Sequence, residues 1–309
     1  MSACEDFNVI IPVKNEALGL KMTLEELLNT GVSRDKIIVV DGGSTDGSRE
    51  IAKNFKVKLI DQKYPGGKAG GVRTGLEVVE ASYAVIIDGD YTYPASHIWD
   101  LCKKASEGYD MVIGVRIPEP NSTNPILRLG NWLLTKWFNL IFGTRLRDVL
   151  SGMYLIRIDT LREAEWETKG FSIESEIVAH IASLSGRISE VPISYRRRIE
   201  PEKKKLKVLD GFKIATDIVK LSWSYNPVFT LFIVASLILI PGLFLDLYYL
   251  YHYSVNNVKY YMKGLMGVIM TLMGFQSLAL AILSLYLKRV ELRLRRSIEV
   301  ALRRQSRWQ

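Results

Sequence analysis

Short apolar runs and amphipathic segments alternate along the first part of the chain. Five runs are rich in β-branched residues, as is typical of strands buried on both faces of a parallel sheet: residues 7–13, 36–41, 57–60, 83–88 and 110–116. Between them, residues 17–29, 48–55 and 68–81 carry apolar positions at helical spacing. Strands that alternate with helices predict an α/β fold with a mostly parallel sheet.

Two long segments near the C-terminus are apolar on every face. Residues 227–245 run for 19 residues, and residues 264–287 for 24, without Asp, Glu, Lys or Arg. Each is long enough to cross a hydrocarbon core of ~30 Å as a helix. Two buried helices of a large soluble protein are the alternative, which an apolar surface on all sides disfavours. The pattern therefore predicts a hairpin of two transmembrane helices.

Residues 125–142 (PILRLGNWLLTKWFNLIF) form a different, amphipathic pattern. Trp132 and Trp137 fall near one face with leucine and phenylalanine, while Arg128 and Lys136 fall elsewhere. Such a helix belongs either to an ordinary core or to a membrane interface with its tryptophans at headgroup depth. The two apolar segments downstream favour the interface, and residues 208–222 are a second candidate of the same kind.

The net charge of +8 is concentrated beside the apolar segments. Residues 196–207 hold seven basic against two acidic side chains, and residues 288–309 hold eight against two. Cytoplasmic flanks of membrane spans carry such an excess, so we expect an integral membrane protein with both termini in the cytosol. Because these flanks explain the basic residues, no nucleic-acid partner is needed. The N-terminus, MSACEDFNVIIP, lacks the layout of a signal peptide, which also places the first two hundred residues in the cytosol.

Neither a zinc site nor a disulfide framework is indicated, because Cys4 and Cys102 are far apart in the sequence and the three histidines are scattered.

One apolar run ends in two aspartates that a single glycine separates, in VIIDGDYTYP (residues 85–94). Asp88 and Asp90 would repel each other unless a cation lay between them, and a divalent cation is the simplest partner. The alternative is that both merely cap a helix that begins near Pro94. Acids also follow two other strands, at Glu16 and Asp41. Ligands bind beyond the carboxyl ends of parallel strands, so this convergence favours a binding site.

Eight motifs in order resemble family 2 inverting glycosyltransferases, and more narrowly the membrane-anchored dolichol-phosphate or polyprenyl-phosphate hexosyl- and mannosyltransferases. They are IPVKNE (11–16), VVDGGSTDGS (39–48), GGKAGGVRTG (66–75), DGD (88–90), GVR (114–116), DVLSG (148–152), FSIESE (171–176) and EVPISYRRR (190–198). The resemblance implies a GT-A type nucleotide-sugar-binding domain over residues 1–205. An interfacial helix or linker (206–226), a transmembrane hairpin (227–287) and a basic cytosolic tail (288–309) would follow.

The resemblance also implies an activity: transfer of a hexose from a UDP- or GDP-sugar to dolichyl or polyprenyl phosphate, with inversion. The metal, Mg²⁺ or Mn²⁺, would be held by Asp88 and Asp90 and would act as a Lewis acid on the departing diphosphate. The implied nucleotide-sugar contacts are Pro12, Val13, Asn15, Glu16, Asp41, Lys68, Asp88 and Gly89. The implied acceptor-phosphate contacts are Arg116, Arg128, Ser151, Arg198 and Lys205. The implied catalytic residues are Asp90, Arg116 and Glu176.

Residues 171–176 bear on the alternative activity, elongation of a glycan at a sugar hydroxyl. Glu174 and Glu176 are expected in the first turn of a helix, where acids are favourable on structural grounds alone. In family members that glycosylate a hydroxyl, an acid in this region acts as the base. A phosphate oxygen is already an anion and can attack the sugar directly.

Processive polysaccharide synthases carry QxxRW before channel-forming helices. The nearest string here, residues 305–308, is one residue short and follows the last span. Two positions also differ from the mannose synthases: Thr92 replaces a glutamine, and residues 204–206 read Lys-Lys-Leu instead of Ser-Lys-Leu. A non-catalytic membrane scaffold is a further alternative, disfavoured by the intact acids. The sugar, the base, the preferred cation and the presence of a homo-oligomer are left open.

Overall fold

The computed structural model describes residues 4–120, 122–161, 173–199 and 210–305. The chain divides into two compact units, Met1–Leu221 and Ser222–Gln309. Lys205, part of FSIESE and the end of the string at 305–308 lie outside the described residues.

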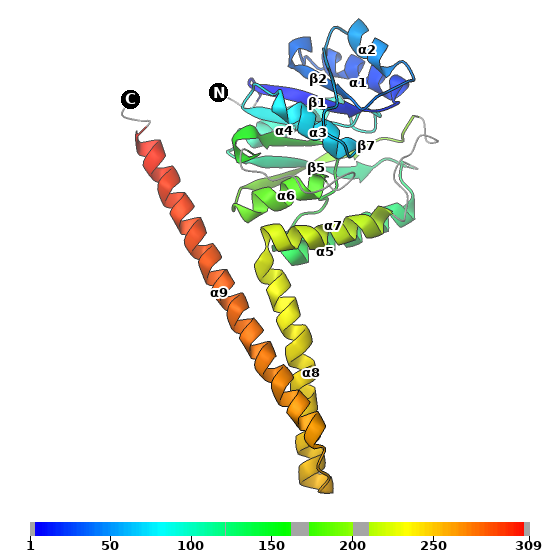
Figure 1. The fold of residues 1–309 in the computed structure, drawn as a ribbon. Helices are drawn as coiled ribbons and strands as arrows, with labels where there is room; N and C mark the ends of the chain where they lie inside the picture. The colour runs from blue at the N-terminus through cyan, green and yellow to red at the C-terminus, as the bar shows by residue number, and fades with distance from the viewer. Residues whose placement is uncertain (1–3, 121, 162–172, 200–209, 306–309) are drawn as a thin grey trace. The chain divides into compact units, whose positions relative to one another are not determined.

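A seven-stranded sheet forms the centre of the first unit (Figure 1). Its strands are β1 (Phe7–Val13), β2 (Ile37–Asp41), β3 (Lys58–Asp61), β4 (Tyr83–Ile86), β5 (Met111–Pro118), β6 (Tyr154–Arg157) and β7 (Ile188–Tyr195). They follow the order β3-β2-β1-β4-β6-β5-β7. The first four are parallel neighbours, β6 runs antiparallel to β4 and β5, and β7 is parallel to β5. The predicted α/β class with a mostly parallel sheet is confirmed.

The helices of this unit are α1 (Ala17–Asn29), α2 (Ser48–Asn54), α3 (Lys68–Glu77), α4 (Ile98–Ala105), α5 (Pro125–Phe142) and α6 (Ile173–Ser183). The last helix, α7 (Asp210–Tyr225), continues past the boundary with the second unit. Three single turns of 3-10 helix complete the described elements: η1 (Arg34–Lys36), η2 (Ala95–His97) and η3 (Ile158–Leu161).

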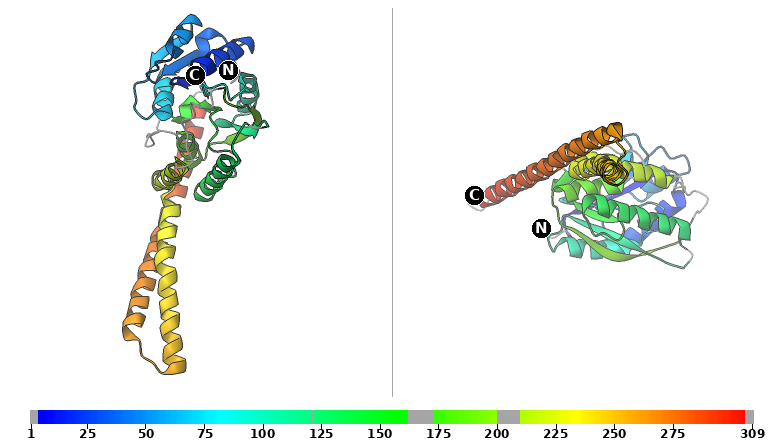
Figure 2. Two further views of the ribbon diagram at one scale, coloured as in Figure 1. Left: turned by 90° about the vertical axis from the view of Figure 1, so that its right-hand side faces the viewer. Right: turned by 90° about the horizontal axis from the view of Figure 1, so that it is seen from below.

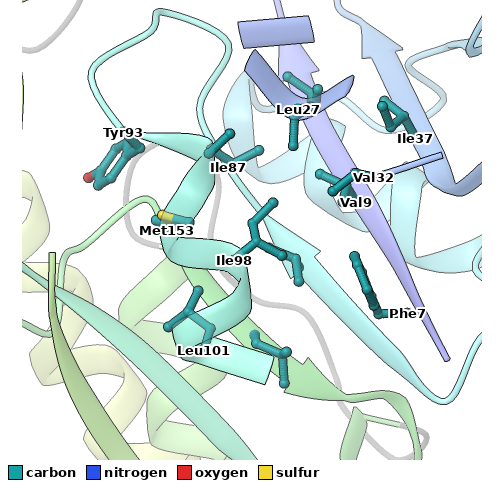
Figure 3. Packing of buried hydrophobic residues seen from close by; sticks show 14 of the residues in the cluster. Phe7, Val9, Leu27, Val32, Ile37, Ile87, Tyr93, Ile98, Leu101 and Met153 are labelled. Atoms are coloured by element: carbon teal, nitrogen blue, oxygen red, sulfur yellow. The ribbon is translucent and has the colours of Figure 1, made fainter. Parts of the chain in front are cut away.

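The main core lies between one face of the sheet and helices α1 and α4 (Figure 3). Strand side chains such as Phe7 and Val9 meet Leu27 of α1 and Leu101 of α4, all fully buried or nearly so. All five residues of β2 are buried, as a central parallel strand requires. Packing against both helices fixes the strand ends, and with them the loops that follow.

Helix α5 presents an apolar surface to solvent. It begins at an Asn124 cap, whose Oδ1 accepts from the Ile126 N–H, and ends at Gly143 in a left-handed conformation. Its inner face holds Phe138 and Ile141. Its exposed apolar side chains are Ile126, Leu129, Trp132, Leu133, Trp137 and Leu140. Helix α7 likewise buries Ile214, Ile218 and Leu221 while exposing Phe212, Val219 and Trp223.

The second unit contains α8 (Pro227–Asn256) and α9 (Tyr261–Gln305), which pair as an antiparallel hairpin (Figure 2). Residues 227–256 and 261–291 are each long and apolar enough to cross a membrane. Small residues allow close approach: a Cβ on Gly242 would lie 2.7 Å from the Thr271 backbone nitrogen, and one on Gly274 would lie 2.6 Å from the Leu239 Cα. The Thr271 hydroxyl donates to Asp246 over 2.7 Å, so this carboxylate between the spans is hydrogen-bonded.

Candidate active site

A cavity of about 1140 Å³ opens in the first unit, beyond the carboxyl ends of β1 and β4. The loops after these strands, the glycine-rich turn before α3, the end of β5 and helix α5 all contribute to its wall. Ten of the residues predicted from the sequence line it: Pro12, Val13, Glu16, Lys68, Asp88, Gly89, Asp90, Arg116, Arg128 and Arg198.

Lys68 connects two carboxylates in the cavity wall. Its Nζ lies 2.6 Å from Asp88 Oδ1 and 2.5 Å from Glu174 Oε1. Burial alone would lower the pKa of Lys68, but the charges of Asp88 and Glu174 raise it well above its usual value. The ammonium therefore stays charged. A Cβ on Gly152 would overlap the Asp88 carboxylate, so only glycine fits beside it.

Asp90 and Arg198 lie near this group, because the charge of Asp88 acts on Asp90. Asp90 Oδ1 accepts from the Thr92 backbone N–H at 3.1 Å and from the Thr92 hydroxyl at 2.6 Å. Arg198 pairs with Glu16 and approaches Asp90 Oδ2 to 3.5 Å. Burial, together with the charge of Asp88, raises the pKa of Asp90. The second carboxylate of DGD is therefore held in place by Thr92, and its burial beside Asp88 disfavours the charged form.

We call these six side chains the negative cluster: Glu16, Lys68, Asp88, Asp90, Glu174 and Arg198. Four carboxylates against two cationic groups leave a formal charge of −2. Among the described residues, no group of three or more His, Cys, Asp or Glu side chains could hold a metal by itself. Asp88 and Asp90 supply the oxygen ligands that a divalent cation prefers, and such a cation would neutralise the cluster.

Arg116 organises a second polar network in the cavity wall. Its guanidinium forms a bidentate pair with Asp148, with both N···O distances 2.7 Å, and also donates to Asn131 Oδ1 at 3.0 Å. Asn131 in turn donates to Asp148 Oδ1 at 3.0 Å. Burial alone would lower the pKa of Arg116, but the Asp148 carboxylate raises it well above its usual value. The network fixes the orientation of a buried, charged guanidinium.

Three further arginines, Arg128, Arg147 and Arg197, line the cavity. Arg147 pairs with Glu190 at 3.4 Å, whereas Arg128 and Arg197 form no ion pair with any residue that the structure describes. We call the following six side chains the basic cluster: Arg116, Arg128, Arg147, Arg197, Asp148 and Glu190. Four guanidinium groups against two carboxylates leave a formal charge of +2.

Four residues predicted for the site do not line the cavity. Asn15 accepts from the Thr45 N–H at 2.8 Å, and Asp41 accepts from Gly43, Ser44 and Arg49, so both organise their own loops. Burial opposes ionisation of Asp41, but these hydrogen bonds lower its pKa. Ser151 and Glu176, both 1% exposed, are the other two.

The first turn of α6 holds Glu174 and Glu176, as expected. Only Glu174 lines the cavity and contacts Lys68. Arg198, expected at the acceptor phosphate, pairs with Glu16 and approaches Asp90. Sequence reasoning gave no role to Glu174, Asn131 or Arg197, although Glu174 lay within a recognised motif.

The sequence model of glycosyl transferase family 2 matches residues 8–162. The chain is 29% identical over 280 residues to glycosyltransferase AglJ of Haloferax volcanii, covering 89% of this chain and 91% of the relative. It is 29% identical to a dolichyl-phosphate hexose transferase of the same organism, over 63% of this chain and 84% of the relative. It is 30% identical to an undecaprenyl-phosphate mannosyltransferase of Micrococcus luteus, over 61% and 83%.

Among solved structures, the chain is similar to glucosyl-3-phosphoglycerate synthase of Mycobacterium tuberculosis in complex with Mn²⁺, UDP-glucose and phosphoglyceric acid. The TM-score is 0.57 at 18% identity, over 71% of this chain and 79% of that one. This likeness supports the predicted GT-A fold.

Proposed function

Because the chain belongs to glycosyl transferase family 2, we propose that it transfers a hexose from a nucleotide sugar to dolichyl or polyprenyl phosphate with inversion at the anomeric carbon. Relatives named for transfer to dolichyl phosphate and undecaprenyl phosphate support this choice of acceptor. The observation that carries the proposal is the pair of oppositely charged clusters around one cavity, because a metal-bound diphosphate and a lipid monophosphate need surroundings of opposite charge.

The negative cluster is assigned to the donor diphosphate. A divalent cation bound there would supply Lewis-acid stabilisation of the charge that develops on the departing nucleoside diphosphate. Asp88 and Asp90 would hold that cation, and Lys68 would face the diphosphate oxygens from the turn before α3. Pro12 and Val13 also line the cavity and would contact the nucleoside.

The basic cluster is assigned to the acceptor phosphate. Arg116 is held rigidly by Asp148, which makes it a preorganised partner for a phosphate. Arg128 and Arg197, which form no ion pair with a described residue, can contribute further charge. A phosphate oxygen attacks C1 of the sugar without first losing a proton, so the C1–O bond to the nucleotide breaks as the new bond forms on the opposite face.

The rest of the chain is assigned to the membrane. The two candidate spans would anchor the protein, with the catalytic unit and both termini on the cytosolic side. The exposed tryptophans and leucines of α5 would lie in the interface, near the isoprenoid acceptor. We keep the domain limits expected from the sequence: catalytic to residue 205, interfacial to 226, spans to 287 and then the tail.

One experiment tests the activity directly. Detergent-solubilised full-length protein is incubated with Mn²⁺, a polyprenyl phosphate and a panel of labelled UDP- and GDP-sugars, and the lipid product is identified by mass spectrometry. We expect one hexose linked through phosphate to the lipid. A product linked to a sugar hydroxyl, or no lipid product from any donor, would contradict the proposal.

A further inference from the structure

Glu174 is a member of the negative cluster to which the donor assignment gives no role. It lies in the first turn of α6, and its side chain is only 5% exposed. Its carboxylate contacts the Lys68 ammonium at 2.5 Å, and that ammonium contacts Asp88 at 2.6 Å. One cation is thus shared between an aspartate of DGD and a glutamate from a distant helix.

The shared ammonium creates a conflict at Asp88. A hard divalent cation and an ammonium group both bind carboxylate oxygens, and Asp88 is already paired with Lys68. Gly152 closes another side of this carboxylate, because even a Cβ there would overlap it. If a divalent cation is to use Asp88 fully, the Lys68 ammonium needs a second anionic partner within reach.

We propose that Glu174 is a positioning residue that retains the Lys68 ammonium when a divalent cation occupies Asp88. The inference rests on the proposed function and concerns the negative cluster, to which the donor diphosphate is assigned. Held by Glu174, the ammonium stays beside the diphosphate instead of blocking the carboxylate. Without Glu174, Asp88 is the only carboxylate left within salt-bridge distance of Lys68 among the described residues, so the ammonium competes directly with the divalent cation.

Mn²⁺ binding tests this role separately from catalysis. Full-length protein in detergent is titrated with Mn²⁺ in the presence of UDP and, separately, of GDP, and free Mn²⁺ is followed by electron paramagnetic resonance. Glu174→Gln is expected to weaken Mn²⁺ binding about tenfold or more, the usual cost of losing a partner that positions a metal ligand. Adding Lys68→Met to Glu174→Gln removes the competing ammonium and should restore Mn²⁺ affinity towards the wild-type value.

Asp110→Asn is the matched control. It also removes a largely buried carboxylate from an ion pair, with Arg157 at 2.6 Å, but Asp110 does not line the cavity. Its Mn²⁺ affinity should equal that of the wild type. Thermal unfolding of every variant shows whether a change in affinity reflects loss of the fold.

Two results would overturn the role of Glu174. The first is wild-type Mn²⁺ affinity in folded Glu174→Gln. The second is no recovery of Mn²⁺ affinity in the double variant, because Glu174 would then act on the metal directly. If Glu174→Gln does not fold, Lys68→Met alone decides, because its Mn²⁺ affinity should then be no lower than that of the wild type. Wild-type protein that bound no Mn²⁺ with either nucleotide would instead overturn the donor site itself.

Discussion

The negative cluster and the basic cluster use the same chemical groups to opposite effect. Both pair carboxylates with cationic side chains at one cavity, but the first retains a formal charge of −2 and the second +2. In the negative cluster, each cation is shared between two carboxylates. In the basic cluster, Arg116 holds Asp148 bidentately, while two further arginines have no ion-pair partner among the described residues. The first arrangement attracts a cation and the second an anion.

Under the proposed function, this difference in charge explains how one cavity would bind each of two phosphate-bearing substrates at its own cluster. A diphosphate that carries a divalent cation matches a surface that lacks positive charge, whereas a lipid monophosphate without a cation matches a surface with spare guanidinium groups. Under the proposed function, the two clusters of opposite charge would therefore orient both substrates before reaction. Of the following variants, Asp90→Asn changes the negative cluster, Arg116→Ala changes the basic cluster, and the other two leave both clusters intact.

The largest loss is expected from Asp90→Asn, which keeps the shape of the side chain but removes one charge from the negative cluster. Hexose transfer should fall about a thousandfold or more, because the charge on the departing diphosphate is no longer compensated. Initial rates with labelled nucleotide sugar measure this loss, and EDTA should have a similar effect on the wild type.

Asp35→Asn, at an exposed acid in η1 outside the cavity, is the control and should retain the wild-type rate. Full activity of Asp90→Asn, or of the wild type in EDTA, would remove the cation from the mechanism and leave the negative cluster without a function.

The strand pattern predicted the position of part of the negative cluster. The run that became β1 ends at Val13 as expected, whereas β4 ends at Ile86, two residues before the expected end, so Asp88 and Asp90 lie in the loop after the strand. The roles of Arg198 and Glu174 were not predictable, because each depends on which partner a long side chain meets. β6 and β7 were not predicted as strands: β7 is largely half-buried and contains Pro192, and both lie beyond the region in which strands and helices alternate regularly.

A chain that ends at Leu221 tests use of the membrane-embedded acceptor without changing either cluster. It lacks both candidate spans and the end of α7. We expect turnover of polyprenyl phosphate in vesicles to fall about a hundredfold, because anchoring raises the effective concentration of enzyme at the bilayer. Nucleotide affinity, measured by calorimetry, should be unchanged. A truncated protein that used vesicle-embedded acceptor at the full-length rate would exclude an anchoring role.

Arg116→Ala changes the basic cluster alone. Loss of a charge-assisted phosphate contact costs roughly 1.5–3 kcal/mol, so kcat/KM for the lipid phosphate should fall about 10- to 100-fold. UDP or GDP affinity should hardly change. Arg157→Ala, which breaks an ion pair outside the cavity, serves as the control. Equal losses of kcat/KM for lipid phosphate and of nucleotide affinity would assign Arg116 to the donor. The two clusters would then not bind different substrates.

The smallest effect is expected from Glu176→Gln, which distinguishes a phosphate acceptor from a sugar hydroxyl. Residues two apart on a helix point in different directions, so the sequence could place Glu174 and Glu176 in one turn but could not decide which of them faces the cavity. In the structure Glu174 lines the cavity and Glu176 does not.

If the acceptor is a phosphate, no base is needed, and Glu176→Gln alters only local hydrogen bonds and a favourable acid at a helix N-terminus. Such an acid contributes roughly 0.3–1 kcal/mol, so transfer should slow by less than about tenfold. Rates measured beside Asp90→Asn decide the point. A folded, nucleotide-binding Glu176→Gln protein that was as inactive as Asp90→Asn would show that an acid outside the cavity wall is required. Direct attack by a phosphate oxygen would then fail, and elongation of a glycan at a hydroxyl would account better for the chain.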